Sequence, residues 1–143
     1  MLKRSTSLKS RGDRYKIWLE QAEFDLKAAE LSRDNDFFEW TCFQCEQAVE
    51  KALKSVLVHA GWRPPKMHKL AVLMSYCNKA NDKFKKTKFE FRDLEAFTFV
   101  SRYPFLIPGE NLSPHEFITL DDAQRCINQA KSFLEKIRKL LNV

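Results

Sequence analysis

The segment from Asp36 to Gly61 reads DFFEWTCFQCEQAVEKALKSVLVHAG and constrains the fold more than any other part of the chain. Because an α-helix turns by about 100° per residue, its apolar residues gather on one side and its polar residues on the other. The apolar side comprises Cys45, Ala48, Val49, Ala52, Leu53, Val56 and Ala60, and the polar side comprises Gln44, Gln47, Glu50, Lys51 and Lys54. The pattern predicts an amphipathic helix with one face on a hydrophobic core.

Both ends of this predicted helix carry boundary signals. Asp36 is expected to accept the backbone N–H of Glu39, whose carboxylate reaches back, as in a capping box. At the other end, Gly61 suits the left-handed position that follows a last helical turn, and Pro64 and Pro65 prevent continuation.

Three other stretches repeat apolar residues at helical spacing: residues 13–33, residues 90–101 and the segment that Thr119 opens. Residues 69–81 predict a shorter helix. A second apolar stripe in the first helix, formed by Ile17, Phe24, Ala28 and Leu31, indicates that this helix is contacted from two sides. The inner stripe of the last helix is expected to include Leu120, Ala123, Ile127, Ala130, Phe133, Leu134, Ile137 and Leu141. The sequence predicts an all-α fold, an antiparallel up-and-down bundle of four main helices plus one short helix.

The chain of 143 residues fits one domain with a single core. Residues 1–12 are basic and aperiodic and are expected to form a flexible leader, and residues 13–143 to form the bundle domain. Because no run of 18 apolar residues occurs, no membrane span is expected. We expect a cytoplasmic protein.

Cys42 and Cys45 are spaced like half of a zinc or redox site. Within a helix, however, this spacing merely places them one turn apart. Since the chain offers no second pair of ligands, the sequence favours buried thiols that act as small apolar side chains. We therefore expect no metal and no cofactor.

The net charge of +6 and pI near 9.2 favour anionic partners. Much of the excess lies between Lys79 and Arg92, where lysines alternate with Phe84, Phe89 and Phe91. This stretch either holds nucleic acid by phosphate contacts and base stacking or is a solvated lysine loop.

Three features stand in a fixed order: the tract QAVEKALKSVL at residues 47–57, then His68-Lys69-Leu70, then Arg102-Tyr103-Pro104. Trp18, Ala22, Asp25 and Leu26 fit the same template. Together they resemble the HEPN family, the higher-eukaryote and prokaryote nucleotide-binding domain, from about Asp13 to the C-terminus.

The resemblance implies a helical bundle that forms a homodimer and takes nucleotide or RNA as its ligand. It also implies a minimal nucleotidyltransferase as protein partner, in a toxin–antitoxin or two-component arrangement. Members that are metal-independent ribonucleases carry an Arg, four to six residues and a His near the start of a late helix, and the pairs from two subunits face each other.

This chain departs from that motif, because no His follows Arg102 at the required spacing. Arg63 and His68 have the spacing but lie in a proline-containing connection, and His115 lies too far along the chain from Arg102. The sequence therefore favours a module without catalysis.

Three functions remain open. The first is binding of nucleotide, RNA or a nucleotidyltransferase by a site whose expected ligand-binding residues are Gln47, Glu50, Lys51, Lys54, His68, Arg102 and Tyr103. In it, Arg102 supplies a planar donor fork for phosphate or carboxylate. The second is a metal-independent ribonuclease that uses Arg102 with His68 or His115. The third is a bundle that only dimerises and docks a partner.

Overall fold

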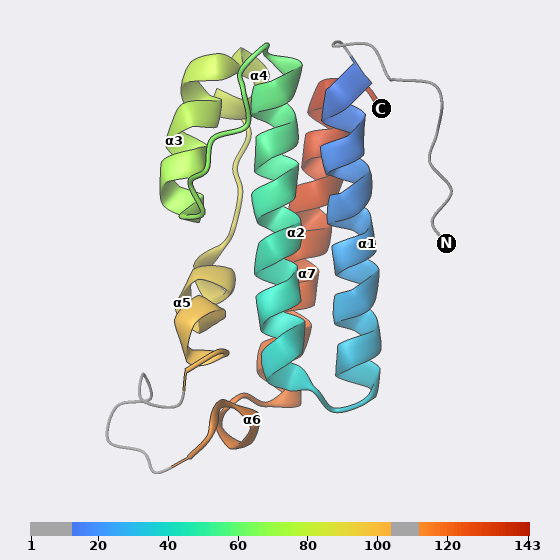
Figure 1. Cartoon of the computed structure of the whole chain (residues 1–143), viewed down its shortest axis with the longest axis vertical. Coiled ribbons are helices and arrows are strands. Elements are labelled where there is room, and N and C mark those ends of the chain that lie inside the picture. The colour runs from blue at the N-terminus through green and yellow to red at the C-terminus, as the bar shows by residue number, and fades with distance from the viewer. Residues whose placement is uncertain (1–12, 104–111) are drawn as a thin grey trace.

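The computed structural model describes residues 13–103 and 112–143, and every regular element in these two ranges is an α-helix (Figure 1). The seven helices of the described ranges are α1 (Arg14–Asp34), α2 (Phe38–His59), α3 (Leu70–Ala80), α4 (Asp82–Lys85), α5 (Arg92–Val100), α6 (Pro114–Phe117) and α7 (Leu120–Leu141). The predicted all-α fold is thus confirmed. The predicted leader, residues 1–12, and residues 104–111 lie outside the described ranges.

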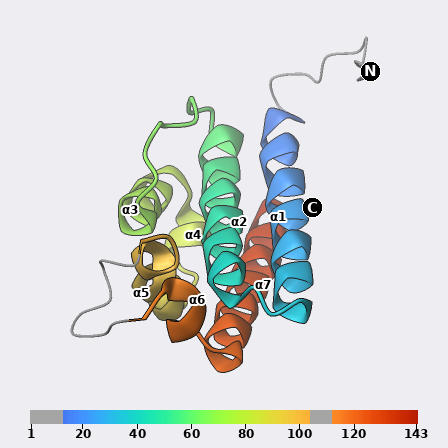
Figure 2. The ribbon, with the colours of Figure 1, turned by 60° about the horizontal axis from the view of Figure 1, so that its bottom comes forward.

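The chain runs up and down the long axis of the molecule. Helix α1 runs one way, α2 returns, the segment from α3 to α5 occupies the third position, and α7 runs back alongside α2 (Figure 1). The third position is therefore filled by several short helices in place of one long one. Figure 2 shows α3, α5 and α6 together on the side of α2 that faces away from α1.

Helix α2 lies at the centre of this arrangement, in contact with α1, α7, α3 and α5. Its apolar side is buried as expected except at Ala60, and Cys45, Ala48 and Leu53 are fully enclosed. Its polar side is largely buried too, because α1, α3 and α5 pack around it; Glu46, Glu50 and Lys54 keep 3–5% of their surface exposed. The polar side of α2 therefore faces other helices over much of its length, and not water.

The predicted capping of α2 by Asp36 is wrong. Asp36 adopts a left-handed backbone conformation with φ of 65°, and the helix begins at Phe38 without a side-chain cap. The N–H of Phe37 instead bonds the carbonyl of Ser32 at 2.8 Å, which closes a tight turn after α1. At the far end Ala60 is exposed as the C-cap, and Gly61 has φ of 93°, as predicted for the residue that ends this helix.

Helix α7 has the predicted start and core face. Thr119 Oγ1 accepts the N–H of Asp122 at 3.2 Å, and Asp122 accepts the N–H of Thr119 at 2.9 Å, so the two form a capping box. Seven of the eight residues predicted to face inward are buried, among them Ile127 and Phe133. Leu120, the first residue of the helix, is the exception at 52% exposed.

The two apolar stripes of α1 have different surroundings. Tyr15, Leu19, Ala22, Leu26 and Ala29 are buried against the rest of the bundle. Ile17, Phe24 and Leu31 are 49%, 56% and 65% exposed, so the second contact that the sequence predicts is not made within the described part of the chain.

The basic stretch is ordered by its aromatic residues. Phe84 is buried and stacks on Phe89, and Phe89 stacks on Phe133 of α7. The rings of Phe84 and Phe89 therefore belong to the core, whereas the neighbouring lysines lie at the surface: Lys83, Lys85, Lys86 and Lys88. Short helix α4 within this stretch, like α6, was not predicted, because one helical turn leaves no periodic pattern.

Four cysteines, Cys42, Cys45, Cys77 and Cys126, are buried and reduced, as the sequence favoured. Burial in apolar surroundings raises the pKa of Cys77 to about 12.

No helix of the described residues is long and apolar enough to cross a membrane.

Candidate functional site

A cavity of about 470 Å³ opens between α2, α5 and the segment that leads into α3. Its lining consists of Phe43, Glu46, Gln47, Glu50, His68, Lys69, Leu70, Glu95, Thr98, Phe99 and Arg102. The α2 residues recur at intervals of three and four positions, and so do those from Glu95 to Arg102, because each set follows one face of a helix or its last turn. The site therefore depends on how α5 packs against α2.

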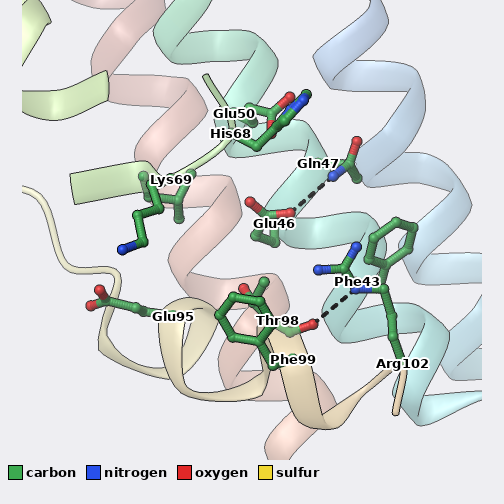
Figure 3. A pocket seen from close by; sticks show the side chains of 11 residues that line it. Phe43, Glu46, Gln47, Glu50, His68, Lys69, Glu95, Thr98, Phe99 and Arg102 are labelled. Atoms are coloured by element: carbon green, nitrogen blue, oxygen red, sulfur yellow. Dashed lines mark hydrogen bonds and ion pairs between the residues drawn. The ribbon is translucent and has the colours of Figure 1, made fainter. Parts of the chain in front are cut away.

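Four of the residues predicted from the sequence meet in this cavity: Gln47, Glu50, His68 and Arg102 (Figure 3). Two come from adjacent turns of α2, one from the connection after the two prolines, and one from the turn after α5. Nδ1 of His68 lies 3.1 Å from Oε1 of Glu50, which ties the connection to α2.

Two other predicted residues, Lys51 and Lys54, are directed elsewhere. Lys51 forms an ion pair with Asp25 of α1. Lys54 lies 3.4 Å from Oε2 of Glu50 and 5.7 Å from the ring centre of Trp18, and it is almost fully buried. Neither lysine lines the cavity, because the packing of α1 on α2 turns this side of the helix toward α1.

Arg102 lies at the mouth of the cavity against three aromatic rings. Its guanidinium carbon is 5.0 Å from the ring centre of Phe43, 5.9 Å from that of Phe99 and 5.6 Å from that of Tyr103. Nε donates a hydrogen bond to the carbonyl of Thr98 at 3.3 Å. This positions the planar cation on aromatic faces while its side chain stays exposed. Tyr103 itself is 43% exposed beside the cavity.

The floor of the cavity is acidic. Glu46 and Glu50 lie one turn apart on α2, and both are buried. Burial raises the pKa of Glu46 to about 7, with a further contribution from the nearby Glu50, while the Gln47 hydrogen bond, Arg102 and His68 act in the opposite direction. Glu50 has partners at both oxygens, Lys54 and His68. Glu46 accepts a hydrogen bond from Gln47 at 3.0 Å on Oε2.

Sequence reasoning missed several residues of this cavity. Glu46 could have been predicted, because it precedes Glu50 by one helical turn and therefore lies on the same face of the helix. Phe43 follows from the same spacing. Glu95, Thr98 and Phe99 could not be assigned to a site, since nothing in the sequence shows which face of α5 meets α2.

A second cavity, of about 350 Å³, lies on the other side of Arg102. It is lined by Glu39, Trp40, Ser101, Arg102, Ser113, Pro114 and His115. Nδ1 of His115 is 4.0 Å from Oε2 of Glu39, an oxygen that is buried and has no hydrogen-bond partner in the described residues. The fold thus places His115 and Arg102 at one cavity although twelve residues separate them in the sequence.

The model of the HEPN domain family matches residues 15–140 of this chain. A protein of Methanocaldococcus jannaschii named "Putative toxin MJ1304" is 29% identical over 132 residues, which cover 88% of this chain and 87% of that protein.

Two crystal structures have the same fold. TT1696 from Thermus thermophilus has a TM-score of 0.73 and 23% identity, over 90% of this chain and 98% of that one. ST0689, described as an archaeal HEPN homologue, has a TM-score of 0.62 and 26% identity, over 88% of this chain and 96% of that one. Because the family model spans nearly the whole bundle and the two cavities beside Arg102, this chain belongs to the HEPN domain family.

Proposed function

We propose that this protein is a nucleotide- or RNA-binding module of a toxin–antitoxin pair and that it acts through the cavity between α2 and α5. The observation that carries the proposal is the position of Arg102, an exposed guanidinium that lies on aromatic faces at the mouth of a cavity large enough for a small ligand. Phosphate is the natural partner of such a cation, and exposed rings beside it suit a base.

Membership of the family and the name of the M. jannaschii relative support the biological setting. From the resemblance we further propose a homodimer and a minimal nucleotidyltransferase as partner. The exposed stripe of Ile17, Phe24 and Leu31 on α1 offers an apolar surface for a second chain.

The binding proposal is tested by titrating the protein with nucleoside monophosphates and with a fluorescein-labelled single-stranded RNA. We expect Arg102→Ala to weaken binding by about tenfold or more, in line with a charge-assisted phosphate contact. Arg14→Ala, an exposed arginine at the start of α1, is the matched control and should bind like the wild type. Equal binding by both variants would contradict the assignment of the site.

Assembly is tested separately. Light scattering after size exclusion should report a dimer, and Phe24→Glu should convert it to a monomer. Co-expression with the product of the neighbouring gene should yield a complex if that product is the nucleotidyltransferase partner. A monomeric wild type would contradict the proposed homodimer. Purification without the neighbouring gene product would contradict the proposed nucleotidyltransferase partner.

A ribonuclease is the second candidate function. It is favoured by the second cavity, where Arg102 and His115 meet and Glu39 lies beside the imidazole. In this reading Arg102 stabilises the charge that develops on the phosphorus oxygens, and His115 transfers a proton. His68, the alternative imidazole, lies with Arg102 at the first cavity.

Incubation of structured RNA with the protein, without added metal, distinguishes these readings. If the second candidate holds, cleavage is lost in Arg102→Ala and in only one of His115→Ala and His68→Ala, which identifies the imidazole. Absence of cleavage by the wild type, or cleavage that survives all three substitutions, would eliminate the ribonuclease.

A further inference from the structure

The cavity beneath Arg102 has a charge pattern that a phosphate site alone does not require. Two buried carboxylates, Glu46 and Glu50, form its floor, whereas the positive groups Arg102 and Lys69 are exposed and so lie toward its mouth. An anion is repelled by such a floor. A ligand that fits must present hydrogen-bond donors to the floor and negative charge to the mouth.

Only one of the two carboxylates is available to a ligand. Glu50 is held by Lys54 at 3.4 Å and by His68 at 3.1 Å. Glu46 accepts from Gln47 on one oxygen, and among the described residues no donor is recorded for the other. Figure 3 shows the Glu46 carboxylate in the middle of the cavity, between the segment of His68 and Lys69 and the α5 residues Thr98 and Phe99.

We propose that this cavity binds a guanine nucleotide, with the Glu46 carboxylate accepting N1–H and the exocyclic amino group of the base. Guanine is the base whose Watson–Crick edge offers two adjacent donors, and a carboxylate offers two adjacent acceptors. Phe43 and Phe99 provide apolar walls for the flat base, and Arg102 reaches the phosphate. This inference rests on the proposed function, since it assigns the ligand of the same site.

An arginine side chain from a protein partner carries the same pair of donors and would also satisfy Glu46. The charges at the mouth favour the nucleotide, because Arg102 and Lys69 repel a second cation and attract a phosphate. Glu95 at the same rim reduces this preference without reversing it, since Arg102 lies on the opposite side of the opening (Figure 3).

The proposal has a pH signature. Glu46 must be ionised to accept two hydrogen bonds, and burial places its pKa at about 7. The groups that surround it are Glu50 on α2, His68 and Lys69 before α3, and Glu95 and Arg102 at α5. Guanine binding should therefore strengthen as the pH rises through the pKa of Glu46. Protonated Glu46 has one donor and one acceptor, which matches adenine, so adenine binding should weaken over the same range.

The test is calorimetric titration with GMP, IMP and AMP at about pH 6, 7 and 8. Because all three nucleotides carry the same monophosphate group, the titration of that group cancels when their affinities are compared as ratios. At the highest pH we expect GMP to bind about tenfold or more tighter than AMP, with the affinity of IMP between the two. The ratio of the GMP affinity to the AMP affinity should decrease toward the lowest pH. Glu46→Gln should abolish the preference for GMP and its pH dependence, because an amide presents one donor and one acceptor. Glu20→Gln, which changes an exposed carboxylate on α1 outside this cavity, should retain both the preference and its pH dependence.

The outcomes separate this inference from the proposed function. If AMP and GMP bind equally, or if Glu46→Gln retains the preference, the guanine assignment is wrong while nucleotide binding stands. If none of the three nucleotides binds, the proposed nucleotide function falls as well. Binding of N-acetyl-arginine amide in their place, lost in Glu46→Gln, would identify a protein partner as the occupant. Melting temperatures of the unliganded variants establish that each is folded.

Discussion

Lys54 and Glu50 form an ion pair inside the protein, with Nζ and Oε2 separated by 3.4 Å and both side chains about 95% buried. The pair lies one turn apart on α2, beneath Trp18 on one side and beside His68 on the other. Sequence alone suggests an ordinary surface pair at this spacing. Its enclosure makes it a structural element on which the acidic floor of the cavity depends.

Removal of Lys54 should therefore be costly. We expect Lys54→Met to lower the free energy of unfolding by about 3 kcal/mol, because it leaves Glu50 buried without its cation. The double variant Lys54→Met/Glu50→Gln should recover most of the loss, since no unpaired charge remains. Urea unfolding at neutral pH measures both. Lys51→Met, whose ion pair with Asp25 is partly exposed, should cost about 1 kcal/mol or less. A double variant no more stable than Lys54→Met would contradict this account.

Glu46 should make stability depend on pH. Its pKa rises from the usual 4.5 to about 7 on folding, so the folded state holds the proton more tightly than the unfolded state. Its contribution to the free energy of unfolding therefore falls as the pH rises from about 4.5 to 7. Glu46→Gln removes this loss and should be more stable than the wild type above that range, by about 3 kcal/mol at most.

The measurement is the difference in unfolding free energy between wild type and Glu46→Gln at several pH values. The contributions of the other carboxylates cancel in this difference. A Glu46→Gln difference that does not change between about pH 5 and 8 would show that Glu46 is not perturbed by burial.

A bidentate ion pair between Glu23 and Arg138 joins α1 to α7. Nη2 of Arg138 lies 2.7 Å from Oε2 of Glu23, and Nε bonds the other carboxylate oxygen. The hydrogen bond from Arg138 lowers the pKa of Glu23, so the stabilisation is present at neutral pH and is lost as the pH falls through that lowered pKa. Because both side chains are more than a third exposed, we expect a coupling of only about 0.5–1 kcal/mol.

A double-mutant cycle with Glu23→Gln and Arg138→Met measures this coupling. It should decrease when the salt concentration is raised, as expected for a solvent-screened pair. A coupling that is unaffected by both acid and salt would mean that packing between the two side chains, and not charge, joins the helices.

Gly61 should resist substitution although space is available around it. Apart from Gly61 itself and its two chain neighbours, no residue that the structure describes has an atom within 4 Å of the position that a Cβ would occupy, yet φ is +93°. The cost of Gly61→Ala is therefore conformational, about 1–2 kcal/mol, and should appear as a lower melting temperature. Gly61→Asn should be milder, since Asn tolerates the left-handed region better. If Ala and Asn are equally harmful, the backbone explanation fails.

Much of the bundle could be predicted because helical periodicity is local. The buried stripe of α7 and the capping of that helix by Thr119 follow from residues within one or two turns. The same holds for Gly61 at the end of α2. The failures also have a local cause. Asp36 has a capping residue's chemistry, but the turn after α1 fixes its backbone in a conformation that cannot cap α2.

The candidate site could be predicted only in part. Gln47, Glu50, His68 and Arg102 were identified and meet in one cavity, whereas Lys51 and Lys54 belong to the contact with α1. In the sequence, the candidate site residues of α2 cannot be distinguished, because all of them are polar residues of one helix. Which of them face a ligand depends on which neighbour covers each side of the helix.

Local sequence was sufficient to predict a helical chain, because apolar spacing and turn residues act over short distances. The order of its motifs added the resemblance to the HEPN family, which the family model confirms. Packing between helices was needed to bury the polar side of α2, to make Glu46 an acidic floor with a raised pKa, and to bring Arg102 and His115 to one cavity. Desolvation and long-range contact arise from that packing, and no single segment of the chain encodes them alone.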